Sequence, residues 1–193
     1  MTYGTRLALA KDGPLKPEPL SSRPAKRMSC DGNAWTTPQH PVSEPNSSAR
    51  VLVFWNPKAG AGLSESRVQQ LAVLLRMQQF ETEVISRIDQ LVQRATELQQ
   101  AGSLRAIVAA GGDGTVVLVA NNTPLGTPIS VLPLGTENLL SKYLGLTPSP
   151  DIVCQTICDG VKVQMDAGEV NGRLFLLMVG CGFDADVVRR LHH

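Results

Sequence analysis

Short apolar runs recur along the chain from residue 50 onwards. RVLVFW at 50–55, LRAIVAA at 104–110 and PISVLPLG at 128–135 are nearly continuous apolar segments, and TEVISR at 82–87 is a shorter, more polar one. Continuous apolar runs of this length are typical of strands that are buried on both faces of a sheet. The pattern therefore predicts four strands.

Amphipathic segments separate these runs. After Ser64, an expected N-cap, apolar residues follow at helical spacing at Val68, Leu71, Leu74 and Leu75. Further helices are expected from Asp89 to a stop at Gly102, after Thr115, and over TENLLSKYLG at 136–145. Strands that alternate with helices predict an α/β fold with an open, doubly wound, mainly parallel sheet.

The pattern changes near residue 160. VKVQMDAGEV at 161–170 and RLFLLMVGCGF at 173–183 flank Asn171-Gly172, the dipeptide most typical of a tight hairpin turn. We expect two strands here and, with them, the start of an antiparallel second lobe.

The N-terminal 48 residues have a different composition. They are rich in Pro, Ser and Asn and show no periodic apolar pattern, which predicts a disordered tail. The chain is thus divided into a tail at 1–48, an α/β domain at 49–160 and the beginning of a second, β-rich domain at 161–193.

Charge and composition exclude several classes of protein. The formal net charge is +1, so a basic face for nucleic acid is not expected. No apolar run approaches the roughly 18 residues that span a bilayer, and the N-terminus lacks the apolar core of a signal peptide. We expect a cytoplasmic protein with no nucleic-acid partner and no transmembrane segment.

Three loops rich in glycine or hydroxyl groups follow predicted strands, at Asn56–Gly62, Gly111–Thr115 and Pro133–Asn138. Ligands of open α/β sheets bind outside the carboxyl ends of the strands. Glycines allow close approach of the backbone, and amide groups at helix N-termini favour phosphate. Together the loops predict a phosphate-binding site. Glycines that only make turns would explain the first loop, but they explain GGDGT poorly.

The charge of Asp113 limits the kinds of ligand and reaction that the loop could serve. A carboxylate among amides that bind phosphate would repel the ligand unless a cation lies between them, so Asp113 indicates Mg²⁺ with a nucleotide phosphate, or a base that acts on a hydroxyl. Thr115 either caps the next helix or binds a phosphate. A Walker-type loop is absent, and a dinucleotide fingerprint would need glycine at Glu65.

GGDGT at 111–115, NPKAG at 56–60, PLGTEN at 133–138 and the segment DAGEVNGRLFLLMVGCGFDADV at 166–187 resemble the diacylglycerol kinase catalytic-domain family. This family includes sphingosine kinases and bacterial lipid kinases, and it shares its nucleotide-binding fold with NAD kinases. The resemblance implies phosphorylation of a lipid hydroxyl, such as that of diacylglycerol or a sphingoid base, with ATP and Mg²⁺. It also implies peripheral association with a membrane surface.

The resemblance also assigns roles to residues. Asp113 would lie at the metal, and Asp186 matches a carboxylate near the substrate hydroxyl, with Asp184 beside it as an alternative; Asp113 and Asp186 are the expected catalytic residues. The residues implied for ATP are Asn56, Ser86, Gly111, Gly112, Asp113, Gly114, Thr115, Gly135, Thr136 and Asn138.

Some positions depart from the family pattern. Val117 and Leu118 replace an Asn-Glu pair, and Glu137 and Leu139 replace the second glycine and the Asp of GTGND. Only the first hairpin of the family's β-rich second lobe is present. The chain is then a fragment of a longer kinase, a degenerate product, or half of an enzyme that is completed by a partner or by a homo-oligomer. An NAD kinase-like enzyme and an inactive nucleotide-binding chain remain as alternatives.

Overall fold

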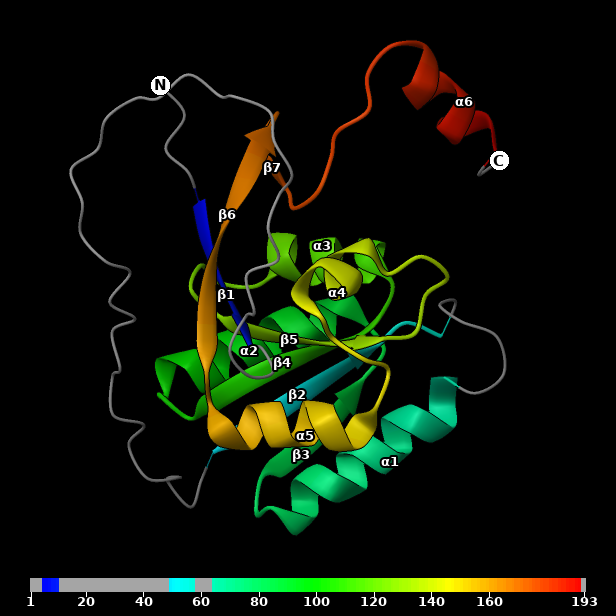
Figure 1. The fold of residues 1–193 in the computed structure, drawn as a ribbon. Coiled ribbons are helices and arrows are strands. Elements are labelled where there is room, and N and C mark those ends of the chain that lie inside the picture. The colour runs from blue at the N-terminus through cyan, green and yellow to red at the C-terminus, as the bar shows by residue number, and fades with distance from the viewer. Residues whose placement is uncertain (1–4, 11–48, 58–63, 192–193) are drawn as a thin grey trace, which may run out of the picture.

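A computed structural model of the protein describes residues 5–10, 49–57 and 64–191. Seven strands in these residues form one sheet (Figure 1). They are β1 (Thr5–Ala10), β2 (Arg50–Trp55), β3 (Glu81–Ile85), β4 (Leu104–Gly111), β5 (Pro128–Pro133), β6 (Lys162–Val170) and β7 (Arg173–Phe175). Their order across the sheet is β3-β2-β4-β5-β1-β6-β7.

The four strands that the apolar runs predict are parallel neighbours. β2 lies between β3 and β4, and β4 pairs with β5, with Val53 opposite Val108 and Ala109 opposite Val131. The side chains of Val53, Val108 and Ala109 have no exposed surface. The predicted parallel α/β sheet is confirmed.

Helices cover both faces of this sheet. They are α1 (Ser64–Met77), α2 (Ile88–Gln100), α3 (Asp113–Asn122), α4 (Leu139–Leu144) and α5 (Pro150–Asp159). A sixth helix, α6 (Phe183–Leu191), stands apart from the sheet (Figure 1). One buried cluster joins Leu52 and Phe54 of β2 to α2, α3 and α4, and the other joins Val51 and Val53 to α1 and α5. Because alternate residues of one strand enter different clusters, the sheet is wound on both sides.

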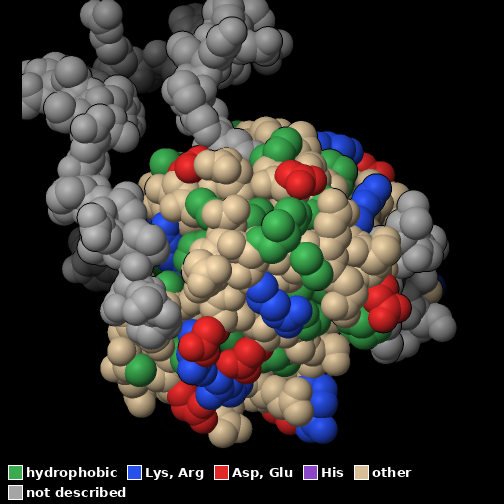
Figure 2. Space-filling view, turned by 90° about the horizontal axis from the view of Figure 1, so that it is seen from below, with side chains coloured by type: hydrophobic (Ala, Val, Ile, Leu, Met, Phe, Trp, Pro, Cys, Tyr) green, Lys and Arg blue, Asp and Glu red, His purple; other side chains and the backbone are tan. Residues whose placement is uncertain are grey.

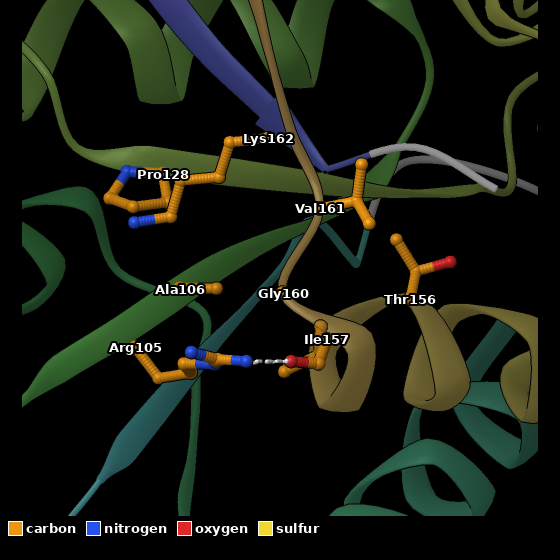
Figure 3. A pocket seen from close by; sticks show the side chains of 8 residues that line it. All are labelled: Arg105, Ala106, Pro128, Thr156, Ile157, Gly160, Val161 and Lys162. Carbon is orange, nitrogen blue, oxygen red and sulfur yellow. Dashed lines mark hydrogen bonds between the residues drawn. The ribbon is translucent and has the colours of Figure 1, made fainter. Parts of the chain in front are cut away.

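Helix α5 was not expected from the sequence. It follows Ser149, has Pro150 in its first turn and ends at Gly160, which adopts a left-handed conformation with φ 68°. At its C-terminal end the guanidinium of Arg105 donates hydrogen bonds to the carbonyl oxygens of Ile157 (2.8 and 3.1 Å) and Cys158 (3.0 Å). Figure 3 shows Arg105 pointing from β4 towards Ile157, beside a small crevice at the amino ends of β4 and β5. This crevice lies at the opposite end of the strands from the glycine-rich loops.

The hairpin is present, but its second strand is shorter than predicted. Asn171 and Gly172 both have positive φ, at 50° and 71°, as the tight turn requires. β7 ends at Phe175, so the prediction of a strand over 173–183 is wrong beyond that residue. The side chain of Asn121 on α3 bonds both the N–H and the C=O of Leu174, and these backbone groups are then satisfied without a further strand.

Strand β1 corrects the prediction for the N-terminal tail. Thr5–Ala10 pairs antiparallel with β6, from Thr5 opposite Ala167 to Ala10 opposite Lys162, and parallel with the start of β5. The predicted disorder of residues 1–48 is therefore wrong for these six residues. Their short TRLALA run finds two strand edges to pair with, which a tail in isolation would lack. Residues 11–48 lie outside the described part of the chain.

None of the helices among the described residues is long and apolar enough to cross a membrane. On the face shown in Figure 2, positive and negative side chains adjoin one another instead of forming a basic stripe.

Candidate functional site

The predicted loops meet at one edge of the sheet because β2, β4 and β5 run in parallel. The backbone N–H of Asn56, just after β2, donates to the carbonyl oxygen of Ala110 in β4 (3.4 Å), and that of Leu134, after β5, donates to Gly111 (3.0 Å). Residues 58–63 of the first loop lie outside the described chain. The ends of the three strands are thus held together by backbone hydrogen bonds.

The loops after β4 and β5 touch through two glycines. A Cβ atom added to Gly135 would lie 2.6 Å from the Cα of Gly112, and one added to Gly112 would lie 3.3 Å from the Cα of Gly135. Any side chain at Gly135 would therefore force the two backbones apart. Glycine is required here by the close approach of two loops.

A third glycine makes room for a threonine. A Cβ atom added to Gly111 would lie 2.2 Å from Oγ1 of Thr115, whose side chain is buried, with 4% of its surface exposed. Thr115 therefore packs against the end of β4, and its N–H donates to the carbonyl oxygen of Gly112 (2.9 Å). Gly112 is the N-cap of α3 and has no side chain to cap the first amide groups of the helix. Those amide groups are suited to an anion.

Asp113 binds backbone amide groups in the neighbouring loop. One carboxylate oxygen accepts the N–H of Leu139 and the other that of Leu140, each at 2.9 Å. These two residues begin α4, so a side chain from the start of one helix caps the start of another. A carboxylate in this position is stabilised by two charge-assisted hydrogen bonds.

Asn138 closes the turn after β5. Its Oδ1 accepts the N–H of Gly135 (3.0 Å), and its Nδ2 donates to the carbonyl oxygen of the same residue (2.6 Å). Asn138 itself has a left-handed backbone, with φ 49° and ψ 49°, a conformation that asparagine tolerates better than most residues. The side chain thus binds its own loop.

The described structure does not bring every predicted site residue to this junction. Gly111, Gly112, Asp113, Gly114, Thr115, Gly135 and Asn138 lie in the two adjoining loops, with the exposed Thr136 between Gly135 and Asn138, and Asn56 is bonded to the end of β4. Ser86 follows β3, an edge strand that β2 separates from β4, and it is exposed.

Asp186 lies on α6, which stands apart from the sheet and its helices (Figure 1). Its carboxylate forms ion pairs with Arg189 and with Arg190 (3.2 Å) of the same helix. Asp184 is exposed on the same helix. The two expected catalytic carboxylates, Asp113 and Asp186, are therefore not adjacent in this arrangement.

The positions that depart from the family pattern have structural roles. Leu118 packs against the buried cluster beneath α2 and α3, and Val117 is half-buried. Glu137 is exposed and pairs with Lys142 at 3.4 Å. Leu118 thus contributes to the core where the family motif has a polar residue.

The donor atoms near the junction do not form a metal site by themselves. Among the described residues no three His, Cys, Asp or Glu side chains are grouped as metal ligands, and both oxygens of Asp113 already accept amide hydrogens. Mg²⁺ in nucleotide sites is usually held by one or two carboxylates together with phosphate oxygens. A metal at this junction would therefore depend on oxygen atoms supplied by the ligand.

The shifted titratable groups lie outside the loops. Burial, and then the neighbouring Cys158, raises the pKa of the Cys154 thiol to about 12, which makes it an unreactive core group. The hydrogen bond from Arg94 lowers the pKa of Glu83, and the positive charge of Arg50 adds to this effect. The shift of Glu83 reflects an ion pair that stabilises the fold, and neither shift indicates a second reactive centre.

The model of the diacylglycerol kinase catalytic domain matches residues 50–170, which is more than half of the chain. The chain belongs to this family. Among curated relatives, a diacylglycerol kinase of Bacillus subtilis is 33% identical over 141 residues, which are 69% of this chain and 46% of that protein. A probable YegS-like lipid kinase of Pseudomonas aeruginosa is 36% identical over 97 residues, covering 49% of this chain and 32% of the relative.

Solved structures agree in fold. The crystal structure of a diacylglycerol kinase from Bacillus anthracis superposes with a TM-score of 0.53 at 24% identity, over 66% of this chain and 45% of that one. The chain spans less than half the length of these relatives. The family and the fold are therefore established for the α/β part that contains the glycine loops.

Proposed function

We propose that this chain binds ATP at the junction of the loops after β4 and β5 and transfers the γ-phosphoryl group to the hydroxyl of a lipid. The observation that carries the proposal is the contact between Gly112 and Gly135 at the start of α3, a helix whose N-cap makes no side-chain hydrogen bond, in a member of a lipid kinase family. Exposed backbone amides at a helix N-terminus are a general device for holding phosphate.

The reaction requires little covalent chemistry from the protein. The lipid hydroxyl oxygen attacks the γ-phosphorus, the bond from that phosphorus to the bridging oxygen of the β-phosphate breaks, and ADP leaves. The hydroxyl proton passes to a base, which we propose is Asp186, with Asp184 as the alternative. Magnesium bound with the nucleotide would neutralise charge on the phosphate oxygens.

This assignment sets a structural requirement for α6. Asp186 is now paired with Arg189 and Arg190 on its own helix. For it to act as the base, α6 must approach the glycine loops and the carboxylate must exchange an arginine for the substrate hydroxyl. We place nucleotide binding in residues 49–160 and contact with the lipid in residues 161–193.

The chain covers 46% of the B. subtilis relative. That it catalyses the complete reaction of a lipid kinase is therefore proposed here as well. We propose that the protein works in the cytoplasm at the surface of a membrane, where its lipid substrate resides.

The test is a phosphotransfer assay with three acceptors. Purified chain is incubated with radiolabelled ATP and Mg²⁺, and with mixed micelles of diacylglycerol, micelles of a sphingoid base, or NAD. A labelled lipid is expected. Labelled NADP would identify an NAD kinase instead, and saturable ATP binding without any product would identify a nucleotide-binding chain that is not a kinase.

Two glycine variants distinguish a specific loss of ATP binding from a general loss of stability. Gly135→Ala should abolish ATP binding because its Cβ atom would meet the backbone of Gly112. Gly102→Ala should keep ATP binding, because Gly102 lies after α2, away from the loops; its φ of 66° strains an alanine there, so this variant controls for a general loss of stability. Equal ATP binding by the Gly135→Ala and wild-type chains would refute the proposed position of the nucleotide.

A further inference from the structure

The loops after β4 and β5 are joined by two side chains whose polar atoms bind backbone groups. Asp113 reaches from the start of α3 to the amide groups of Leu139 and Leu140. Asn138 binds both the N–H and the C=O of Gly135. We call Asp113 and Asn138, with these four hydrogen bonds, the loop clasp.

The clasp holds the glycine contact in place from both sides. Asp113 directly follows Gly112, and Asn138 fixes Gly135, so each of the two touching glycines is secured by one member of the clasp. Asn138 also starts α4, because its carbonyl oxygen accepts the N–H of Lys142 (2.9 Å). Loss of either side chain would free one loop to move relative to the other.

The hydrogen bonds of Asp113 favour one of two roles for its carboxylate, that of a metal ligand or that of a link between the loops. A carboxylate that serves as a metal ligand is oriented by the metal, whereas here one acceptor site of each oxygen is taken by a backbone N–H of α4 at 2.9 Å, which fixes the side chain without a metal. No further acidic or His side chain among the described residues joins it in a group of three that could hold a cation. The charge of Asp113 is instead matched by the two amide dipoles at the start of α4.

We infer that Asp113 and Asn138 are positioning residues of the nucleotide site, and that Asp113 acts through the amide groups of Leu139 and Leu140 and not as a metal ligand. This inference rests on the proposed function. The clasp keeps the amide groups after Gly112 at the geometry that a triphosphate needs, and it does so before any ligand arrives. Preorganised amide groups bind an anion without a cost for ordering the loop.

The two roles predict different dependence on magnesium. A metal ligand contributes to nucleotide binding only when the metal is present, so its loss raises the Mg²⁺ concentration needed for half-maximal binding. A positioning residue contributes to the shape of the cradle, so its loss weakens ATP binding equally in EDTA and in saturating Mg²⁺.

The experiment measures ATP binding to the full chain by calorimetry in both conditions. Asp113→Ala removes two acceptors and should weaken ATP binding about 10- to 30-fold with and without Mg²⁺, whereas Asp113→Asn keeps one acceptor and should weaken it about 3- to 10-fold. Asn138→Gly removes the side chain while keeping a residue that accepts φ 49°, so weaker binding by this variant cannot be attributed to backbone strain.

The hairpin provides the matched control. Asn171 also has a left-handed backbone, with φ 50°, but it lies in the turn between β6 and β7. Asn171→Gly should bind ATP as the wild type does. A loss of affinity in both glycine variants would show that the effect is general and would refute the role of Asn138.

Amide exchange tests the clasp without ATP. In the wild type the Leu139 and Leu140 amide hydrogens should exchange slowly by NMR, and Asp113→Ala should accelerate both while leaving the amides of β4 protected. Unchanged exchange, or an Asp113→Ala chain that binds ATP normally in EDTA and only needs more Mg²⁺, would overturn the inference. Wild-type chain that binds no ATP would refute the proposed function, and amide exchange would still decide separately whether Asp113 joins the loops.

Discussion

The side chain of Asn121 should account for much of the attachment of the hairpin to the α/β core. Its Oδ1 accepts the N–H of Leu174 (2.8 Å), and its Nδ2 donates to the carbonyl oxygens of Leu174 and Val117 (2.9 Å each). The next residue, Asn122, makes the equivalent bond within its own helix, from Nδ2 to Leu118 (2.8 Å), but none of the described hydrogen bonds joins it to the hairpin. The two neighbours therefore differ mainly in the pair of bonds to Leu174.

That difference sets the expected magnitude. Two net hydrogen bonds contribute about 2 kcal/mol to the free energy of unfolding. Replacement of Asn by Ala in a helix returns about 0.5 kcal/mol through propensity, which nearly cancels the loss of the bond to Val117. Asn121→Ala should therefore destabilise the protein by about 2 kcal/mol, the share of the two bonds to Leu174. In Asn122→Ala the loss of one exposed bond and the gain in propensity nearly cancel.

Urea unfolding of the two variants measures this difference directly. In a thermal scan, Asn121→Ala should lower Tm by about 4–8 °C relative to Asn122→Ala. The exchange of the Leu174 amide hydrogen should also accelerate in Asn121→Ala alone. Free energies of unfolding that agree within about 0.5 kcal/mol for the two variants would refute the argument, because that is the limit of ordinary surface effects.

Two further predictions concern the fold. Arg105→Ala should lower the free energy of unfolding by about 2 kcal/mol, because the carbonyl groups of Ile157 and Cys158 at the end of α5 lose a charged donor; urea titration measures this, and an unchanged midpoint would contradict it. The Glu83 carboxyl has its pKa lowered from 4.5, first by the hydrogen bond from Arg94, so its stabilisation is present above 4.5 and is lost as pH falls through the lowered folded-state pKa. The free energies of unfolding of the wild type and Glu83→Gln should therefore converge on acidification, which unfolding titrations at pH values about one unit apart would measure. A difference that stays constant from about pH 6 to the lowest pH at which the protein folds would count against the ion pair.

The parallel sheet could be predicted because each of its strands can be recognised from its own short stretch of sequence. RVLVFW and LRAIVAA are apolar over their whole lengths, as strands covered on both faces must be. Helix α5 is harder to recognise, since PDIVCQTICD contains several residues of low helix propensity and owes its stability to packing and to the cap from Arg105. Strand β1 could not be found by local pattern, because its main partner, β6, lies far along the chain.

In the candidate site, too, some features could be predicted from the sequence and others could not. GGDGT and PLGTEN identify the loops, and the contact between Gly112 and Gly135 explains two of their glycines. Asp113 accepts hydrogen bonds from the backbone amide groups of Leu139 and Leu140. Because every residue but proline has such a group, the sequence does not indicate which ones a side chain binds. A carboxylate beside glycines predicted a cation, and the two amide hydrogens that Asp113 accepts could not be predicted with it.

Strand β1 lies outside the residues that match the family, which begin at 50, yet it stands between β5 and β6 in the sheet. β1 therefore bridges the α/β core and strand β6 of the hairpin. A cut in the chain between β1 and β2 would leave Thr5–Ala10 held by its pairing with β5 and β6 alone. A nicked protein would behave as a two-chain complex until denatured. The same property makes Thr5–Ala10 suitable as a peptide that is added in trans to a chain lacking it, so that completion of the sheet between β5 and β6 can be started at a chosen moment.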